Sequence, residues 1–547
     1  MSETGNRPYD AVVIGGGING CGVARDLTLR GLRVALVERR DLGAGTSGHS
    51  SGMIHGGPRY LLREREVTRA SCVDAGRIRA IAPHLCFRIP FLVPILRGTS
   101  RVMAEALEAY MEAYDHFAPL KDGRPHTRLS ADEARRIEPG LGPEVAGAVT
   151  FDEWGIDGFR LCLMNARDAR LHGADVFTYS PAVALLRDGA AVVGAVVRTR
   201  EGERRLEAPV VVNVAGPWAP EVAQLAGVTV RLRRGKGVHL VYGRRLGNFG
   251  IMTRAVDGRW IFVEPQQNGA LLGTTDDDTY AGADELRVSR DEVEYLIEGI
   301  AHVLPSIRDH RFLRTIVGVR PTLYEYGRSP DALSRDHAIL DHEEDGAPGL
   351  LTMVGGKLAY YRAMCEELAD AVCRKVGSQA ACTTHVRSLP GAGAADAGLI
   401  AERFLVPEPA AARLVFRHGS DARQMLESAQ ESDRGVLCSC EPVLRAEARY
   451  ALDAEGATSI DDLRRRTRLG EGTCQGTWCI GRASALLHEV GAASVEQAHR
   501  CAIESLRERW RGRTAALDQP GTATLATEEL MQSRYFLVGD YGRLPWA

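Results

Sequence analysis

Residues 10–38 combine a short apolar run, a glycine-rich turn, a helical stretch and a second apolar run that ends on an acidic residue. The turn follows the pattern Gly-x-Gly-x-x-Gly at Gly15, Gly17 and Gly20, and the acidic residue is Glu38. In such a unit the first glycine makes the turn, the second lets a pyrophosphate approach the backbone, and the third lets the helix pack closely on the strand. The helix N-terminus faces the phosphates, and the acidic side chain accepts hydrogen bonds from ribose hydroxyls. The order of these elements predicts a dinucleotide-binding βαβ unit.

The loop after this unit is rich in hydroxyl groups. It contains a second match to the glycine pattern, residues 43–48, but no apolar run precedes that match, so we interpret it as a loop. Thr46, Ser47 and Ser51 can hydrogen-bond a pyrophosphate and a flavin edge. This stretch favours FAD over NAD. Because the sequence holds no second fingerprint behind a strand, we do not expect the protein to bind both FAD and NAD.

Two later apolar runs, residues 210–214 and 350–354, are also followed by glycine-containing turns. Both runs are typical of buried strands, and ligands gather at the carboxyl ends of such strands in an open α/β sheet. A cation at the N1 and O2 edge of a flavin would stabilise its anionic reduced form. The turn residues that we assign to the cofactor are Gly216, Gly355, Gly356, Lys357 and Leu358.

The composition limits the size, the compartment and the partners of the protein. A chain of 547 residues is too long for one hydrophobic core, and 45% hydrophobic residues is an ordinary globular value. The formal net charge of -3 provides no global field that would attract nucleic acid. The N-terminus lacks the pattern of a signal peptide, and no segment reaches the roughly 18 apolar residues of a membrane span. The sequence therefore predicts a cytoplasmic protein that has no transmembrane segment and binds no nucleic acid.

A basic run at residues 464–468 is the one feature that suggests nucleic acid. No aromatic residues are interleaved with its arginines, so we interpret the run as the solvated face of a helix. Ser459 and Asp462 stand in capping-box spacing at the start of that helix, which is predicted over residues 459–467.

Four of the 12 cysteines form a distinct pattern, with Cys438 and Cys440 separated by 33 residues from Cys474 and Cys479. The arrangement places four thiolates at two loop positions, which is what a [2Fe-2S] cluster requires. Zinc is the alternative, although its ligand pairs usually have two to four intervening residues. A disulfide is disfavoured in a reducing compartment. The spacing favours the cluster.

Several motifs together resemble the FAD-dependent glycerol-3-phosphate dehydrogenases. They lie at residues 15–20, 38, 54–60, 211–218, 272–276, 317–321 and 355–358. The resemblance covers about residues 9–389 and departs from the family at Pro58, where a leucine is common. It implies an α/β fold in which a Rossmann-like FAD-binding domain is interleaved with an antiparallel-sheet substrate domain, as in D-amino-acid oxidase.

The resemblance also implies a substrate and a reaction. In that family a hydride passes from C2 of sn-glycerol 3-phosphate to flavin N5, which yields dihydroxyacetone phosphate. A positioned base must take the proton of the C2 hydroxyl, and His239 and His55 are the two candidates. Arginine suits the phosphate because its guanidinium group bonds two oxygens at once. The residues assigned to the substrate are Arg59, Tyr60, His239, Arg320 and Lys357, and Arg320 and Lys357 are also counted as catalytic.

Domain boundaries follow from the resemblance and from a stretch of small residues after residue 389. An FAD-dependent oxidoreductase is expected over residues 1–390, with FAD-binding parts at about 8–85, 150–230 and 335–380 and substrate parts at about 86–149 and 231–334. Residues 391–434 are interpreted as a linker and a helical segment. Residues 435–510 resemble the bacterioferritin-associated ferredoxin module that anaerobic members of the family carry, which implies a small helical [2Fe-2S] domain. Residues 511–547 are expected to be a tail, whose aromatic stretches 535–538 and 544–546 either dock a partner or cap the body.

The two cofactors together indicate a direction of electron flow. A flavin takes two electrons at once and a cluster passes them singly, so we expect electrons to leave for a one-electron acceptor. The resemblance implies partner subunits that lead to quinone, with peripheral attachment at the cytoplasmic face of the inner membrane as an option. Two alternatives remain at this point. One is an amino-acid, opine or 2-hydroxy-acid dehydrogenase with the same cofactors, and the other is a non-catalytic electron-relay subunit.

Overall fold

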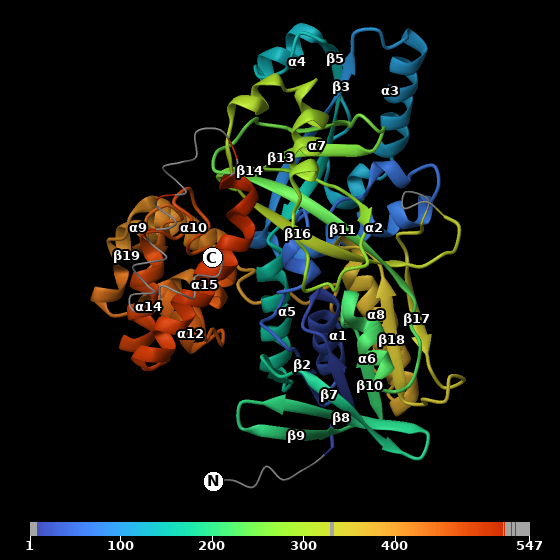
Figure 1. The fold of residues 1–547 in the computed structure, drawn as a ribbon, viewed down its shortest axis with the longest axis vertical. Coiled ribbons are helices and arrows are strands. Elements are labelled where there is room, and N and C mark those ends of the chain that lie inside the picture. The colour runs from blue at the N-terminus through green and yellow to red at the C-terminus, as the bar shows by residue number, and fades with distance from the viewer. Residues whose placement is uncertain (1–7, 329–332, 518, 520–526, 528–530, 532–547) are drawn as a thin grey trace.

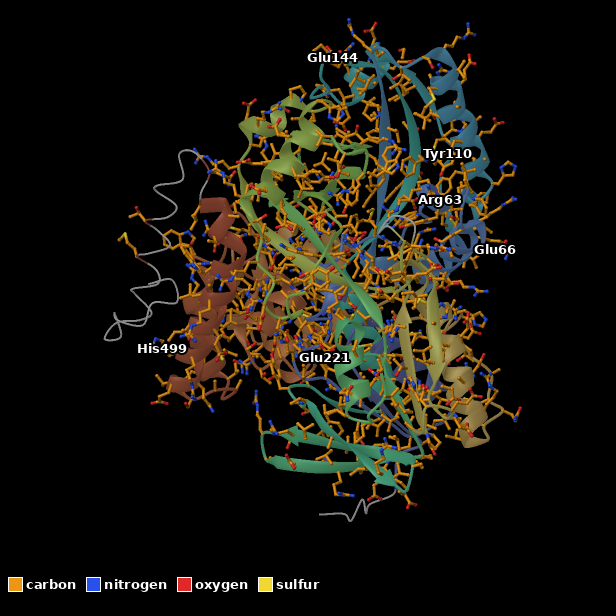
Figure 2. The ribbon with its side chains drawn as sticks, turned by 45° about the vertical axis from the view of Figure 1, so that its right-hand side comes forward. Arg63, Glu66, Tyr110, Glu144, Glu221 and His499 are labelled. Carbon is orange, nitrogen blue, oxygen red and sulfur yellow. The ribbon has the colours of Figure 1, made fainter. Side chains whose placement is uncertain are left out.

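The computed structural model describes residues 8–328, 333–517, 519, 527 and 531. Figure 1 shows an elongated body with a parallel sheet in its lower half and a long antiparallel sheet in its upper half. A helical unit from the C-terminal part of the chain packs against one side of this body. In Figure 2, His499 marks that helical unit and Glu144 marks the top of the antiparallel sheet. None of the helices in the described ranges is long and apolar enough to cross a membrane.

The lower sheet contains the predicted nucleotide unit. Its strands within the described residues are β1 (Ala11–Ile14), β2 (Val34–Val37), β6 (Asp175–Phe177), β10 (Val210–Asn213), β17 (His337–Asp341) and β18 (Leu350–Gly355). Their order is β17-β18-β10-β1-β2-β6, and the pairing is parallel except between β17 and β18. The continuous apolar runs of β1, β2 and β10 are fully buried, as expected for parallel strands that are covered on both faces.

Helices cover one face of this sheet, and a small antiparallel sheet covers the other. Ala11 and Val13 pack among the helices, whereas Val12 and Ile14 pack toward the small sheet. The helices are α1 (Ile18–Leu29), α5 (Gly158–Leu171) and α8 (Tyr361–Val376). The second face is covered by β7 (Ala182–Asp188), β8 (Ala191–Thr199), β9 (Gly202–Glu207) and α6 (Ala219–Gln224).

The upper sheet is almost entirely antiparallel; the pairing between β12 and β3 is parallel. Its strands in the described part of the chain are β3 (Cys86–Leu96), β4 (Arg128–Ser130), β5 (Val145–Ile156), β11 (Leu232–Tyr242), β12 (Gly250–Arg254), β13 (Trp260–Gln266), β14 (Gly269–Gly273), β15 (Asp277–Asp278) and β16 (Phe312–Leu323). They come from residues 86–156 and 232–323, which overlap the ranges expected for the substrate domain. The helices of this half are α2 (Arg65–Ile81), α3 (Arg101–Asp115), α4 (Ala131–Ile137) and α7 (Arg290–Ala301).

The helical unit has two small cores. The first joins α9 (Ala397–Phe404), α10 (Glu408–His418) and α11 (Asp421–Glu427). The second joins β19 (Val436–Cys438), β20 (Val443–Leu444), α12 (Arg445–Asp453), α13 (Ile460–Thr467), α14 (Cys479–Glu489) and α15 (Val495–Leu517). Ser459 and Asp462 form the predicted capping box at the start of α13.

The tail does not begin at residue 511, as the sequence analysis expected. α15 continues past residue 510 to Leu517, and the buried Ala516 joins the core of the upper sheet. The carbonyl of Gly512 accepts a hydrogen bond of 3.1 Å from the Thr315 hydroxyl on β16. Residues 511–517 are therefore part of the folded body. The aromatic stretches at 535–538 and 544–546 lie outside the described residues.

The arginine run of α13 does not form a solvated face. Arg465 and Arg466 each lie 2.7 Å from the buried carboxylate of Asp41, in the loop after β2, and the side chain of Arg466 is only 3% exposed. Arg464 pairs with Glu471 at 2.8 Å. Our interpretation was wrong because the carboxylates that bind these arginines come from other segments, and the local charge pattern does not show them.

A second buried ion pair also ties the helical unit to the lower sheet. Arg160 of α5 donates two hydrogen bonds of 2.8 Å to the carboxylate of Glu455, and both side chains are fully buried. Breaking such a pair leaves a buried charge without compensation, which is far more costly than losing an exposed pair.

We therefore expect Glu455→Gln to lower the free energy of unfolding by about 3 to 5 kcal/mol. The matched control is Glu294→Gln, which removes an exposed pair with Arg290 on α7 and should cost about 0.5 kcal/mol or less. Denaturant and thermal unfolding of the purified protein measure both variants. Equal losses in the two variants would contradict this account of the interface.

Candidate active site

The glycines of the first turn have separate steric roles. Gly15 has φ +117°, and a Cβ atom there would lie 2.6 Å from the carbonyl oxygen of Val214. At Gly20 a Cβ atom would come within 1.7 Å of the Gly15 carbonyl oxygen, so only glycine allows this approach of helix and strand. At Gly17 the nearest atom to a Cβ would be the Ser47 hydroxyl oxygen at 3.3 Å, which leaves the backbone open to a ligand.

Side-chain oxygens gather around the same turn. The Ser47 hydroxyl accepts a hydrogen bond of 2.9 Å from the amide of Ile18 in the first turn of α1. This contact shows that the helix N-terminus offers a donor to an oxygen ligand. The Glu38 carboxylate accepts hydrogen bonds from the amides of Gly16 at 2.7 Å and Arg40 at 2.8 Å. Burial raises the pKa of Glu38.

A cavity of about 240 Å³ runs along these groups, and we call it the nucleotide cavity. It lies at the carboxyl ends of β1, β2, β10 and β18, where parallel strands present their loops. The residues that we predicted for the cofactor and that line it are Gly15, Gly17, Glu38, Thr46, Ser47, Gly216, Gly355, Gly356, Lys357 and Leu358. Gly20 is buried beneath the turn, and Ser51 lines the adjoining cavity instead.

The adjoining cavity has a volume of about 260 Å³, and we call it the inner cavity. It shares Thr46, Ser50 and the segment 355–358 with the nucleotide cavity, so the two spaces meet at these residues. One part of its wall is polar and cationic, formed by His55, Arg59, Tyr60, Arg320, Arg335 and Lys357. The other part is apolar, formed by Met53, Phe91, Phe151, Met252, Trp260 and Phe262.

The arginines of the inner cavity are held by backbone and carboxylate groups behind them. Arg320 of β16 donates to the Thr275 carbonyl at 2.9 Å and to the Thr274 hydroxyl at 2.8 Å. Asp276 lies 2.8 Å from Arg335 and 3.4 Å from Arg320. Burial acts to raise the pKa of Asp276, but the nearby guanidinium groups lower it. The aspartate therefore stays ionised and holds several arginines in place.

Lys357 is the most exceptional cation of the site. Its buried Nζ atom has no hydrogen-bond partner among the residues that the structure describes. The amine lies 4.6 Å from the centre of the Tyr60 ring, which it faces as a cation faces an aromatic ring. Burial lowers the pKa of Lys357 to about 8. A buried amine without a partner is a ready donor for an anionic ligand.

The loop that carries Arg59 and Tyr60 accommodates the departure at Pro58. Pro58 occupies the first position of the short helix η2 (Pro58–Tyr60), where a proline costs no hydrogen bond. Its carbonyl accepts a hydrogen bond from the hydroxyl of Tyr110 on α3. Figure 2 shows Tyr110 on the same side of the molecule as Arg63, which directly follows this loop.

The two histidines occupy different positions. His55 lines the inner cavity, and its pKa lies well below the usual value because of burial and then of the charges of Lys357, Arg59 and Lys121. No hydrogen bond of its ring is seen within the described ranges. His239 on β11 is 2% exposed and does not line the inner cavity. Its Nε2 lies 3.0 Å from the Ser51 hydroxyl, which stands between it and that cavity.

Several groups of the site were missed by sequence reasoning. Arg335 stands in no recognisable motif and reaches the cavity only through the fold. Glu153 on β5 also lines the cavity and forms a buried ion pair of 2.6 Å with Lys121. Its carboxylate accepts a hydrogen bond from the Gly56 amide at 3.2 Å and thereby supports the loop that carries His55. The one signal in the sequence was a pair of acidic residues in a strand that otherwise reads as buried.

The four predicted ligand cysteines come together in the helical unit. The thiols of Cys438 and Cys479 are hydrogen-bonded, which lowers the pKa of Cys438 to about 6. Burial and a hydrogen bond with Cys440 raise the pKa of Cys474. The Cys479 thiol also interacts with Cys438, Cys474 and Cys440, so the four side chains lie near one another. No three His, Cys, Asp or Glu side chains of the described chain are arranged to hold a single metal ion.

Comparisons with known families agree with this architecture. Residues 10–362 match the family model described as FAD dependent oxidoreductase. Residues 382–490 match the model described as C-terminal domain of alpha-glycerophosphate oxidase. The second match spans both the segment 391–434 and the four cysteines.

Similar structures share the fold. The glycerol-3-phosphate dehydrogenase of Bacillus halodurans, solved with FAD, has a TM-score of 0.75 at 23% identity and covers 93% of this chain and 96% of its own. The L-α-glycerophosphate oxidase of Mycoplasma pneumoniae has a TM-score of 0.51 at 19% identity, covering 70% of this chain and 100% of its own.

Similar sequences extend over most of the chain. One subunit of the anaerobic glycerol-3-phosphate dehydrogenase of Escherichia coli K12 is 35% identical over 519 residues, which is 94% of both chains. The protein of the same name from Haemophilus influenzae is 34% identical and covers 92% of this chain and 89% of its own. Glycerol-3-phosphate dehydrogenase 1 of Mycobacterium tuberculosis is 34% identical and covers 84% and 91%. The chain therefore belongs to the family of FAD-dependent glycerol-3-phosphate dehydrogenases.

Proposed function

We propose that this chain oxidises sn-glycerol 3-phosphate to dihydroxyacetone phosphate with FAD and passes the electrons through a [2Fe-2S] cluster to an external acceptor. The observation that supports this function most directly is the inner cavity, where Arg59, Arg320, Arg335 and Lys357 converge beside the nucleotide cavity. A phosphate monoester satisfies several cations at once, because each guanidinium group bonds two of its oxygens.

The polar and apolar parts of the inner cavity suggest how the substrate lies. The phosphate would be held by the arginines and by Lys357, whose Nζ lacks a partner among the described residues until an anion arrives. The aromatic side chains opposite them limit the space for water around the carbon chain. FAD, when bound in the nucleotide cavity, supplies the hydride acceptor at its N5 atom.

We assign the role of the base to His55. Its ring lines the inner cavity, and burial together with three neighbouring cations keeps the imidazole neutral and able to accept the proton of the C2 hydroxyl. His239 acts through Ser51, which it holds by a hydrogen bond of 3.0 Å. The sequence alone left His239 and His55 as two candidates for the base.

The cysteines of the helical unit fit a [2Fe-2S] cluster. A cluster of two irons takes two thiolates on each iron, and the four cysteine side chains that lie near one another supply that number. Zinc ligand pairs usually have two to four intervening residues, whereas Cys438 and Cys440 have one. Cys438, Cys440, Cys474 and Cys479 would hold the cluster, which supplies one-electron transfer.

The acceptor is proposed to be a partner. The relatives from Escherichia coli and Haemophilus influenzae are each named as one subunit of an enzyme, which indicates that those two proteins assemble with others. Trp478, next to the ligand Cys479, is 71% exposed and offers an aromatic contact at the cluster. An exposed tryptophan beside a redox centre is typical of a docking surface. Quinone reached through such partners, at the cytoplasmic face of the inner membrane, is the route we favour.

An anaerobic titration with substrate tests this function. Glycerol 3-phosphate should bleach the flavin and then produce the EPR signal of a reduced [2Fe-2S] cluster, whereas proline, sarcosine and 2-hydroxy acids should do neither. Cys474→Ser should abolish the cluster spectrum and leave flavin bleaching intact. Bleaching by an amino acid or a hydroxy acid alone would overturn the substrate assignment, and no bleaching at all would favour a relay protein.

The assignment of the base is tested by two substitutions. His55→Gln should lower kcat by roughly 10²- to 10⁴-fold, which is the usual contribution of general-base catalysis. His239→Gln is the matched control. It should lower kcat by less than about tenfold, since the His239 side chain contacts Ser51 and does not line the inner cavity. The measurement is the steady-state rate with an artificial acceptor, normalised to bound FAD. A larger loss in the His239 variant would contradict the assignment.

The role of Lys357 predicts a pH dependence. Its pKa is lowered to about 8, so the cation is present below that pH and is lost as the pH rises through it. Because kcat/KM reports the free enzyme, kcat/KM for glycerol 3-phosphate should fall above about pH 8. Lys357→Arg should remove this fall, since arginine stays protonated. An unchanged pH profile in the variant would exclude Lys357 as the titrating group.

A further inference from the structure

One strand, β16, connects the flavin site with the segment that carries Cys474. Near its start, Arg314 of β16 forms an ion pair with Glu471 of the helical unit. Further along, the Val319 carbonyl accepts a hydrogen bond of 2.6 Å from the Thr46 hydroxyl, which lines both cavities. Arg320, the next residue, lines the inner cavity. From Arg314 to Arg320 the strand spans about 20 Å, at about 3.3 Å per residue.

The segment opposite Arg314 is residues 469–476, which we call the cluster loop. Glu471 is shared between Arg314 and Arg464, and the second contact measures 2.8 Å. The Gln475 side chain donates to the Glu471 carbonyl at 3.0 Å and closes the loop on itself. Arg509 of α15 donates to the Gln475 carbonyl at 3.0 Å. Each end of the loop is therefore held by a charged side chain from another element.

The cluster loop lies against both the upper sheet and Cys440. At Gly243, just after β11, an added Cβ atom would lie 2.9 Å from Thr473, the neighbour of Cys474. At Gly472 an added Cβ atom would lie 2.4 Å from the Cβ of Cys440. The neighbours of Gly243 are side-chain atoms of Leu313 and Thr473, whereas those of Gly472 include backbone atoms of Cys440. The neighbour of Cys474 in the chain thus contacts the sheet that forms the inner cavity.

Burial strengthens the contact between Arg314 and Glu471. Their side chains are 18% and 8% exposed, so the pair is largely shielded from water. Such a pair is costly to break from one side, because the remaining charge is left without compensation. It is therefore suited to hold a loop at a defined distance from a neighbouring strand.

We infer that electrons cross from the flavin to the cluster beside β16, and that Arg314 is a positioning residue that holds the cluster loop at transfer distance through Glu471. This inference rests on the proposed cluster. The reduced flavin holds two electrons and the cluster accepts one, reducing one ferric iron to ferrous iron. The external one-electron acceptor must reoxidise the cluster before the second electron crosses, and the protons of the reduced flavin pass to water.

The test compares Arg314→Gln with the wild-type holoprotein in anaerobic stopped-flow experiments. Flavin bleaching by glycerol 3-phosphate should stay within about twofold, while cluster reduction should slow by roughly tenfold or more, as expected when a reacting group is displaced. Arg314→Lys, which keeps the positive charge but lacks the planar guanidinium group, should recover most of the rate of cluster reduction. Arg445→Gln is the control, since it removes a pair with Glu489 within the helical unit.

Two further measurements separate the outcomes. Hydrogen exchange of residues 469–476 should increase in Arg314→Gln, and iron content and the EPR signal after dithionite should match the wild type. If hydrogen exchange of residues 469–476 increases in Arg314→Gln while the rate of cluster reduction stays unchanged, the inference is overturned. It is also overturned if flavin bleaching slows as much as cluster reduction does. A wild-type protein with no cluster signal would instead refute the proposed cofactor.

Discussion

Parallel pairing around β1 is the constraint on which the rest of the site depends. β1 pairs with β2 on one side and with β10 on the other, and β10 pairs with β18, all in the same direction. The carboxyl ends of four strands therefore meet at one edge of the sheet. This places Gly15, Glu38, Gly216 and Gly355 around one cavity, although they are far apart in the chain. The inner cavity can form only where the second sheet approaches that edge.

Electrostatics then decides what the inner cavity can bind. Four cationic side chains line it, and buried carboxylates behind the wall compensate part of their charge. Asp276 neutralises arginines on one side, and Glu153 pairs with Lys121 on the other. Lys357 has no such partner among the described residues. The arrangement leaves a positive charge that faces inward, and a phosphate ester is the natural complement of that charge.

The helical unit is joined to the flavin body by buried arginine–carboxylate pairs. Arg160 with Glu455, Arg466 with Asp41 and Arg314 with Glu471 each bridge the two parts of the chain. Arginine suits this task because its planar fork is less strongly hydrated than an amine and bonds two oxygens. These pairs give the helical unit a fixed place on the body, which the proposed electron transfer to a cluster in that unit would require.

Local patterns in the sequence determined the nucleotide turn and the four cysteines that are proposed as ligands. The steric demands of Gly15 and Gly20 act between neighbouring elements, and the spacing of Cys438 and Cys440 restricts the site that they can form. The tertiary structure alone decided which histidine reaches the inner cavity and brought Arg335 there. It also buried the arginine run of α13. Burial and ion pairing depend on partners from distant segments, and no local pattern can show those partners.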